Sequence, residues 1–206
     1  MTRLSAIVAA VAVVVGLAAV GWFALRPSNG DPFAPCRTTA VAGGTAAIGG
    51  PFELTDGAGR RVTDAEIITG PTLVYFGYTF CPDVCPIDLS RNALAAAELA
   101  ERGTKVGQVF ITVDPARETP EVMRDFSAAI DPDLVGLTGS DDDIAKAAAA
   151  YKVFYRKSGD DPDYYLMDHL ALTYLMEPGT GFLEVYRSEA TPEEVADSVA
   201  CYASRL

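Results

Sequence analysis

Two cysteines, Cys81 and Cys85, stand four positions apart where an apolar run meets a helical pattern. The preceding run, Thr72–Tyr78, is rich in β-branched and aromatic residues, which predicts a buried strand. Good helix formers follow over Ile87–Arg102. We therefore expect both thiols at a strand-to-helix corner. The helix dipole and the free N–H groups at such a corner favour the thiolate, the form that binds metals and attacks disulfides.

The spacing of the two cysteines favours metal binding over thiol exchange. Exchange motifs usually have two residues between the cysteines, and here there are three. We expect Pro82 to open the helix, so that positions i and i+4 share one face and both sulfurs converge on one ion. Soft thiolates select Cu(I), Zn(II) or iron–sulfur clusters. The alternative is a plain disulfide or two inert core thiols, which the flanking prolines and Asp83 disfavour.

The single histidine, His169, precedes two apolar runs that predict a β-hairpin, Leu170–Met176 and Phe182–Tyr186. If this hairpin joins the sheet that carries the first strand, it begins close to the dithiol corner, and His169 lies there. Two thiolates and a neutral imidazole suit Cu(I), whereas zinc would want a fourth ligand. A lone histidine is more often structural, so its clustering with cysteines is what favours a ligand role. We expect Asp83 and Asp168 to lie outside the ligand set.

The elements around these residues predict an α/β sandwich with a central mixed sheet. Capping signals place three further helix starts after Thr119, Ser140 and Thr191, the last helix spanning Pro192–Ala203. Two more apolar runs predict strands, Gly107–Val113 and Leu134–Thr138. A dithiol at the end of the first core strand, followed by a late hairpin, is the thioredoxin-like arrangement.

The N-terminal segment is uncharged from Leu4 to Leu25, about 22 residues, which is the length of a membrane-spanning helix. Small residues at Ala18–Gly21 leave a cleaved signal peptide as the alternative. We expect a membrane anchor over residues 1–26, a linker over 27–47 and one domain over 48–206. Arg3 favours an N-terminus inside, although Arg26 on the other flank weakens this bias.

The net charge of −12, without a basic stripe, argues against nucleic acid or anionic lipid surfaces as partners. Four cysteines in an exported domain suggest two pairs, and four cysteines allow three connectivities. The corner placement favours a redox-active pair of Cys81 with Cys85. We then expect Cys36 and Cys201 to form a structural disulfide between the two ends of the domain. In the chain-entropy model a loop of about 165 residues would contribute about 4–5 kcal/mol.

Three segments, in order after the expected anchor, resemble the Sco/SenC family. They are FGYTFCPDVCP at Phe76–Pro86, the V-D-P of Val113–Pro115, and Asp168 followed by His169. The resemblance spans about Phe52 to Tyr202, and its cysteine segment is highly specific. Two positions depart from the family pattern. Leu170 stands where members often have Ser or Thr, and Glu118 with Thr119 stands where they often have Asp. Neither departure removes a ligand.

The resemblance implies a thioredoxin-like fold and binding of copper, as Cu(I) or Cu(II), by Cys81, Cys85 and His169. It also implies delivery of copper to the binuclear copper site of cytochrome c oxidase subunit II, after loading by an upstream donor. The corresponding location is the inner (cytoplasmic) membrane of a bacterium, with a single span and the C-terminal domain in the periplasm.

Two functions follow from these residues. The first is a copper metallochaperone that transfers its ion by exchange of thiolate ligands, which is not an enzymatic reaction. The alternative is a thiol–disulfide oxidoreductase in which Cys81 and Cys85 are catalytic and reduce the cysteines of the oxidase copper site. A thiol peroxidase is a more distant third, since related folds host it.

Overall fold

The computed structural model describes residues 13, 15–16, 22, 31–39, 47–161 and 164–206. The chain divides into two compact units, Met1–Ala34 and Pro35–Leu206, and the second holds all the elements discussed below. Most of the expected anchor, Leu4–Leu25, lies outside the described residues, as does part of the expected linker. Among the helices that the structure does describe, none combines the length and the apolar character needed to cross a membrane. The expected domain boundaries stay a prediction.

A seven-stranded mixed sheet forms the centre of the second unit, in the order β2-β1-β5-β4-β3-β8-β9. Strands β3, β4 and β5 are parallel, and their neighbours on both sides pair antiparallel. This confirms the expected α/β architecture with a central mixed sheet. The strands are β1 (Glu53–Asp56), β2 (Arg61–Thr63), β3 (Thr72–Gly77), β4 (Gly107–Thr112), β5 (Leu134–Thr138), β8 (Leu172–Glu177) and β9 (Gly181–Arg187).

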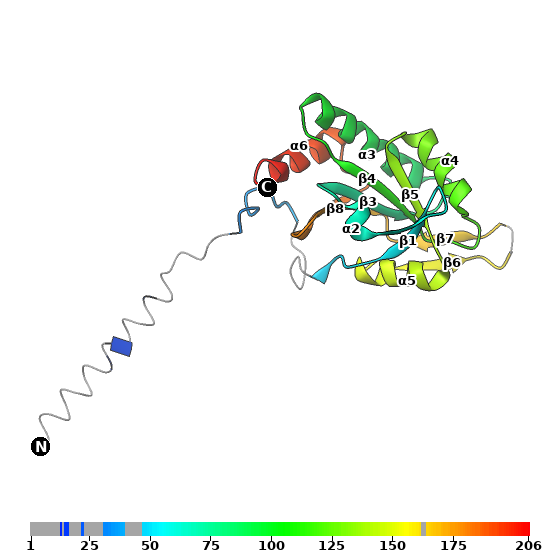
Figure 1. Ribbon diagram of the computed structural model, residues 1–206, viewed down its shortest axis with the longest axis horizontal. Helices are drawn as coiled ribbons and strands as arrows, with labels where there is room; N and C mark the ends of the chain where they lie inside the picture. The colour runs from blue at the N-terminus through cyan, green and yellow to red at the C-terminus, as the bar shows by residue number, and fades with distance from the viewer. Residues whose placement is uncertain (1–12, 14, 17–21, 23–30, 40–46, 162–163) are drawn as a thin grey trace, which may run out of the picture. The chain divides into compact units, whose positions relative to one another are not determined.

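Helices cover both faces of this sheet (Figure 1). The helices are α2 (Asp64–Ile67), α3 (Val84–Glu101), α4 (Pro120–Ile130), α5 (Asp141–Ala150) and α6 (Pro192–Ala203). Helices α3, α4 and α6 lie on one face and α5 on the other. On the α5 side, the ring of Tyr151 packs between those of Phe76 and Tyr174, with centroids 5.2 and 5.6 Å away. Aromatic side chains therefore pack against β3, the strand that leads to the cysteines, on the α5 side of the sheet.

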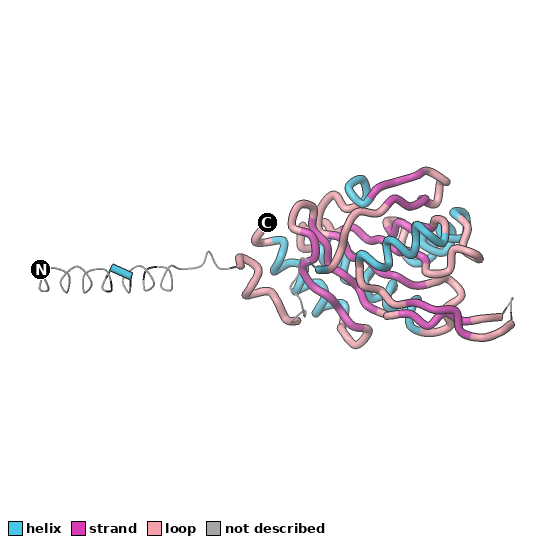
Figure 2. Tube along the Cα trace, turned by 90° about the horizontal axis from the view of Figure 1, so that it is seen from below, coloured by secondary structure: helices cyan, strands magenta, loops and turns pink. Residues whose placement is uncertain are grey.

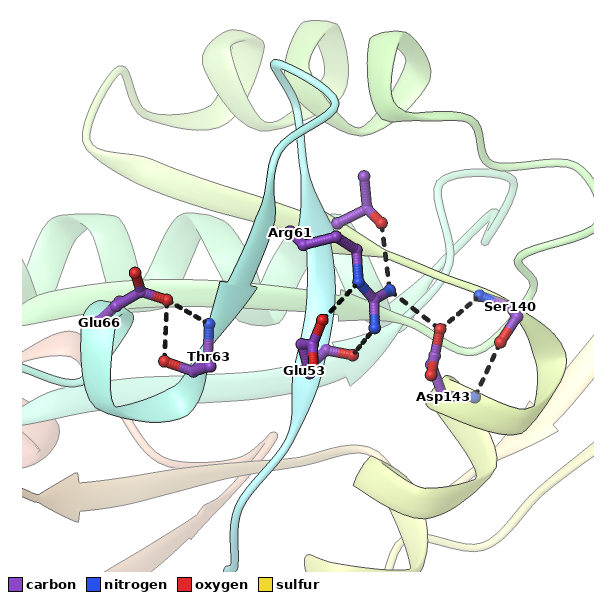
Figure 3. Close-up of polar contacts among 7 residues, drawn as sticks. Glu53, Arg61, Thr63, Glu66, Ser140 and Asp143 are labelled. Atoms are coloured by element: carbon purple, nitrogen blue, oxygen red, sulfur yellow. Dashed lines mark hydrogen bonds and ion pairs between the residues drawn. The ribbon is translucent and has the colours of Figure 1, made fainter.

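The three helix starts expected from capping signals are confirmed, because Thr119, Ser140 and Thr191 each cap a helix with the side-chain oxygen. In α5 the Asp143 carboxylate accepts a hydrogen bond from the Ser140 N–H, and it also forms an ion pair with Arg61 at 3.0 Å (Figure 3). The acidic first turn of α5 thus has a structural role, as a solvated helix N-terminus should.

Two features were missed by the sequence patterns. The first is the short pair β1–β2 with helix α2. The second is a separate two-stranded sheet made by β6 (Tyr155–Ser158) and β7 (Leu166–His169). In both views this β6–β7 hairpin lies at the end of the unit opposite the C-terminus (Figures 1 and 2). Its residues are mostly exposed or half-buried, so they show no apolar alternation that could reveal a strand.

The segment before the sheet is fixed to the last helix. Cys36 and Cys201 are joined by a disulfide, with a sequence separation of 165. The carboxylate of Glu184, which is fully buried, accepts hydrogen bonds from the Thr38 N–H at 2.8 Å and from the Tyr202 hydroxyl at 3.3 Å. The hydroxyls of Thr38 and Thr39 donate to the same carboxylate. A covalent bond and a buried polar cluster therefore hold this segment on the domain.

Candidate metal centre

The two cysteines lie between the end of β3 and the first turn of α3. The helix begins at Val84, so the expectation that Pro82 opens it was wrong, and Cys81 lies in the connecting loop. The backbone of Asp83, with φ −140° and ψ −89°, is not helical, so Asp83 is the N-cap and Pro82 lies before the helix. Cys85 lies in the first turn, and its N–H donates to the Cys81 sulfur at 3.4 Å. The sulfurs converge through this loop-to-helix contact, not through a shared helix face.

Space for the buried sulfur is left by a glycine at the end of β3. Cys85 has no exposed surface. A Cβ placed on Gly77 would lie 2.9 Å from the Cys85 sulfur and 2.9 Å from the Tyr75 ring. Real Cβ atoms do not approach other atoms so closely, so any side chain at position 77 would displace the thiol or the ring. Gly77 is thus part of the construction of the site.

The pKa values of the two thiols are shifted in opposite directions. A hydrogen bond from the Cys85 side chain is the main cause that lowers the pKa of Cys81 well below its ordinary value, and it outweighs the burial that would raise the pKa. Donation to Cys81, together with burial, raises the pKa of Cys85. Neither is in a disulfide, and Cys81 is half-buried. The pair therefore presents one accessible thiolate and one protonated thiol held beneath it.

His169, the last residue of β7, brings an imidazole to this dithiol. Its Nε2 lies 3.3 Å from the Cys85 sulfur. Its ring meets those of Tyr75 and Tyr78 edge to face, with centroids 6.3 and 5.8 Å away. Its Nδ1 is buried and has no hydrogen-bond partner within the part of the chain that the structure describes. Nε2 is therefore the nitrogen placed to bind an ion shared with the two sulfurs.

The structure brings together the three ligands that the sequence predicts. The ligand atoms of Cys81, Cys85 and His169 all lie within 4.8 Å of one another, close enough for one ion to contact all three. Asp83 and Asp168 are not members of this cluster, and Asp168 instead pairs with Arg156 at 2.7 Å. Two sulfurs and one imidazole nitrogen form a soft donor set, which fits Cu(I) better than a hard ion.

The sequence singled out Glu118 and Asp114 only as family positions, and their roles in shaping the site were not predicted. Glu118 is buried, accepts a hydrogen bond from the Thr112 hydroxyl at 2.6 Å and another from the Thr79 N–H, and so holds the loop that precedes Cys81. Burial raises the pKa of its carboxyl group. Asp114, two residues after β4, contacts both Arg117 and Tyr165. The available signal was a set of polar residues directly after a buried strand, where functional side chains often gather.

Comparisons with known proteins agree with this geometry. A family model described as SCO1/SenC matches residues 40–204. Protein SenC of Rhodobacter capsulatus is 49% identical over 207 residues, which cover 100% of this chain and 91% of that protein. The chain described here, an α/β protein with a Cys–Cys–His cluster, belongs to the SCO1/SenC family.

A relative and a solved structure from a plant extend the likeness. The mitochondrial SCO1 homolog 1 of Arabidopsis thaliana is 40% identical over 157 residues, which cover 76% of this chain and 47% of that protein. The chain thus spans about half the length of this relative. The crystal structure of Arabidopsis thaliana ScoI with copper bound superposes with a TM-score of 0.73 at 38% identity, covering 77% of this chain and 99% of the other. Copper is therefore the metal held by a homologous structure.

Proposed function

We propose that this protein carries copper on Cys81, Cys85 and His169 and delivers it to the binuclear copper site of cytochrome c oxidase subunit II. The observation that carries the proposal is the convergence of two sulfurs and one imidazole nitrogen within 4.8 Å. Cu(I) accepts two or three soft ligands, so a fourth position stays open for a thiolate of the acceptor. The ion then moves as thiolates of the acceptor replace the ligands of this protein one at a time, and no covalent bond of a substrate is made or broken.

The surroundings of the ligands suit a transient partner. Each ligand-bearing segment carries an exposed large apolar side chain, namely Phe80 beside Cys81, Ile87 in the first turn of α3 and Leu170 after His169. Their exposed fractions are 51, 59 and 39%. Apolar side chains left exposed around a site mark a surface for a protein partner. An acceptor domain that covers this rim would exclude water while ligands are exchanged.

The proposed location follows from the N-terminal segment. We propose that Leu4–Leu25 anchors the chain in the inner membrane as a single span and that the metal centre lies in the periplasm, where an upstream donor loads it. The support is the uncharged run of spanning length. The intact mass of membrane-extracted protein tests this, because a mature species that begins near Gly21 would reveal a cleaved signal peptide.

A second candidate function is a thiol–disulfide oxidoreductase that reduces the acceptor's cysteines. The observation in its favour is the lowered pKa of Cys81, an accessible thiolate above the buried thiol of Cys85. In thiol–disulfide exchange, the Cys81 thiolate would attack an acceptor disulfide and form a mixed disulfide with it. The Cys85 sulfur would then attack the Cys81 sulfur of this mixed disulfide, which releases the reduced acceptor and leaves a Cys81–Cys85 disulfide. The two electrons come from this dithiol.

Substitution of His169 separates the two functions. His169→Ala leaves both thiols, so an oxidoreductase should keep most of its exchange activity with a disulfide of the subunit II domain. A copper donor should lose Cu(II) binding and fail to load the acceptor. The decisive measurement is copper transfer to a purified, reduced subunit II domain by the wild-type protein and by His169→Ala. Equal transfer by both would remove His169 from the proposed site.

A further inference from the structure

The β6–β7 hairpin that carries His169 needs outside support. It pairs within itself only, from Tyr155 opposite His169 to Ser158 opposite Leu166, and it shares no strand pairing with the seven-stranded sheet. Isolated two-stranded hairpins are marginally stable in water. The chain joins His169 to β8 through two residues, so the hairpin is attached to the sheet at that end, and side-chain contacts must fix its orientation on the domain.

Tyr165, the residue before β7, supplies such contacts. It is only 6% exposed, and its hydroxyl donates to an oxygen of Asp114 at 2.7 Å. The other oxygen of Asp114 accepts from the Nε of Arg117, and a second nitrogen of Arg117 donates to the Tyr165 carbonyl at 3.0 Å. The guanidinium also lies 3.6 Å from the centre of the Tyr165 ring. Arg117 thus holds the backbone and the ring of the same residue.

Arg117 also contacts the other side of the site. Its guanidinium lies 5.0 Å from the centre of the Phe80 ring, and Phe80 immediately precedes Cys81. Cation–π contacts of this kind stabilise more strongly when the cation is desolvated. Only 22% of the Arg117 side chain is exposed. One planar cation therefore bridges the loop of one proposed ligand and the hairpin of another.

We propose that Arg117 is a positioning residue that fixes the His169 hairpin against the Cys81 loop and thereby sets the imidazole as the third copper ligand. The proposal rests on the copper function proposed above. Lysine cannot replace it, because a point charge lacks the planar fork that stacks on an aromatic ring while donating to a carboxylate and a carbonyl at once. Arg117 touches no ligand atom and acts only through the two segments it joins.

The test compares Arg117→Met with Arg102→Met. Methionine keeps most of the arginine stem, and Arg102 is a matched control because it also bonds two partners, Glu98 and Asp197, but on α3 and α6. In the apo-protein, we expect amide hydrogens of Leu166–His169 to exchange faster in Arg117→Met only. In the loaded protein, we expect Cu(II) affinity to fall about tenfold or more, as for the loss of other groups that orient a ligand, and the spectrum of the bound Cu(II) to differ from that of the wild-type protein.

A double-variant cycle shows whether the effect passes through His169. The cycle uses Cu(I), which the two remaining thiolates still bind in His169→Ala. In that background, Arg117→Met should cause no further loss of Cu(I) affinity, because the ligand it positions is already absent. An equal loss in both backgrounds would overturn the proposal in favour of a general structural role. A wild-type Cu(II) spectrum together with wild-type amide hydrogen exchange in Arg117→Met would also overturn it.

A third variant covers the case in which Arg117→Met does not fold, since Asp114 would lose a charged partner. Arg117→Lys keeps that charge, and we expect it to show the same faster exchange of β7 and a partial spectral shift. A folded Arg117→Lys with wild-type spectrum and exchange would overturn the proposal. If instead wild type and His169→Ala bind Cu(II) alike, the proposed function has failed, and this outcome is distinct from the others.

Discussion

The dithiol corner and the His169 hairpin are built in opposite ways. The corner follows β3, whose six residues are all buried and which pairs with β4 on one side and β8 on the other. The hairpin pairs only with itself, and no residue of β7 is fully buried. A position fixed by a core strand is determined by many small contacts, whereas the hairpin depends on fewer, with Tyr155 and Met167 only partly buried against the core. The sulfur ligands should therefore be the permanent part of the site and the imidazole the adjustable part.

The largest effect should come from the thiols themselves. Cys81→Ser and Cys85→Ser each replace a soft sulfur with a hard hydroxyl. Because loss of an outer-shell partner alone typically costs about 10–100-fold in metal affinity, we expect Cu(I) affinity to fall by more than about 100-fold in either variant. Competition with a Cu(I) chelator measures this. A loss of less than about tenfold in either variant would contradict the view that both sulfurs are ligands.

Gly77→Ala tests whether the corner is as rigid as its burial indicates. The new methyl group would lie 2.9 Å from the Cys85 sulfur, and overpacking of this kind destabilises by about 1–3 kcal/mol. Gly70→Ala is the matched control, because a Cβ there meets nothing within 4 Å. Urea unfolding of both variants measures the difference. Equal free energies of unfolding would show that the corner yields and that the contrast with the hairpin is wrong.

The two sulfurs should also differ in reactivity. An ordinary thiol has a pKa of about 8.5 and is protonated over pH 5–7. The lowered pKa of Cys81 keeps this residue a thiolate over that range, whereas the raised pKa of Cys85 keeps its thiol protonated. In the reduced apo-protein, iodoacetamide should modify Cys81 at a rate nearly constant over pH 5–7 and should spare Cys85. Peptide mapping identifies the modified residue. A rate that rises about tenfold per pH unit, as for an unperturbed thiol, would refute the prediction.

The smallest effect should come from the exposed ion pair of the hairpin. Arg156 and Asp168 are 2.7 Å apart, with exposed side-chain fractions of 68 and 46%. Exposed pairs contribute about 0–1 kcal/mol, so Arg156→Ala should change the free energy of unfolding by no more than that and leave the Cu(II) spectrum intact. A spectral change as large as that expected for Arg117→Met would mean that this pair, too, positions His169.

The residues that a sequence reveals here are those whose chemistry or local signal is strong. Helix starts at Ser140 and Thr191 follow from local capping, and Cys81, Cys85 and His169 are conspicuous because such side chains cluster at metal sites. The same local signals could not place the hairpin, since Arg156 and Lys157 give β6 no apolar alternation.

The supporting residues were hidden for a different reason. Arg117 and Tyr165 are 48 positions apart, and an arginine or tyrosine in isolation is an ordinary surface residue. Their role depends on which loops the fold brings together. Similarly, the start of α3 was misplaced because Pro82 and Pro86 are both acceptable in a first turn, and only the non-helical backbone of Asp83, the N-cap, decides between them.

The Cys36–Cys201 bridge also determines how a mechanical load would pass through the molecule. A pull on the chain ahead of Cys36 is carried by the covalent bond directly into helix α6, at the other end of the sequence from β1. The Glu184 cluster shares that load between the same segment and β9. Tension thus enters at α6 and β9, and neither element carries Cys81, Cys85 or His169. A pull on the N-terminal end of the domain is therefore received by elements that hold none of the three proposed ligands.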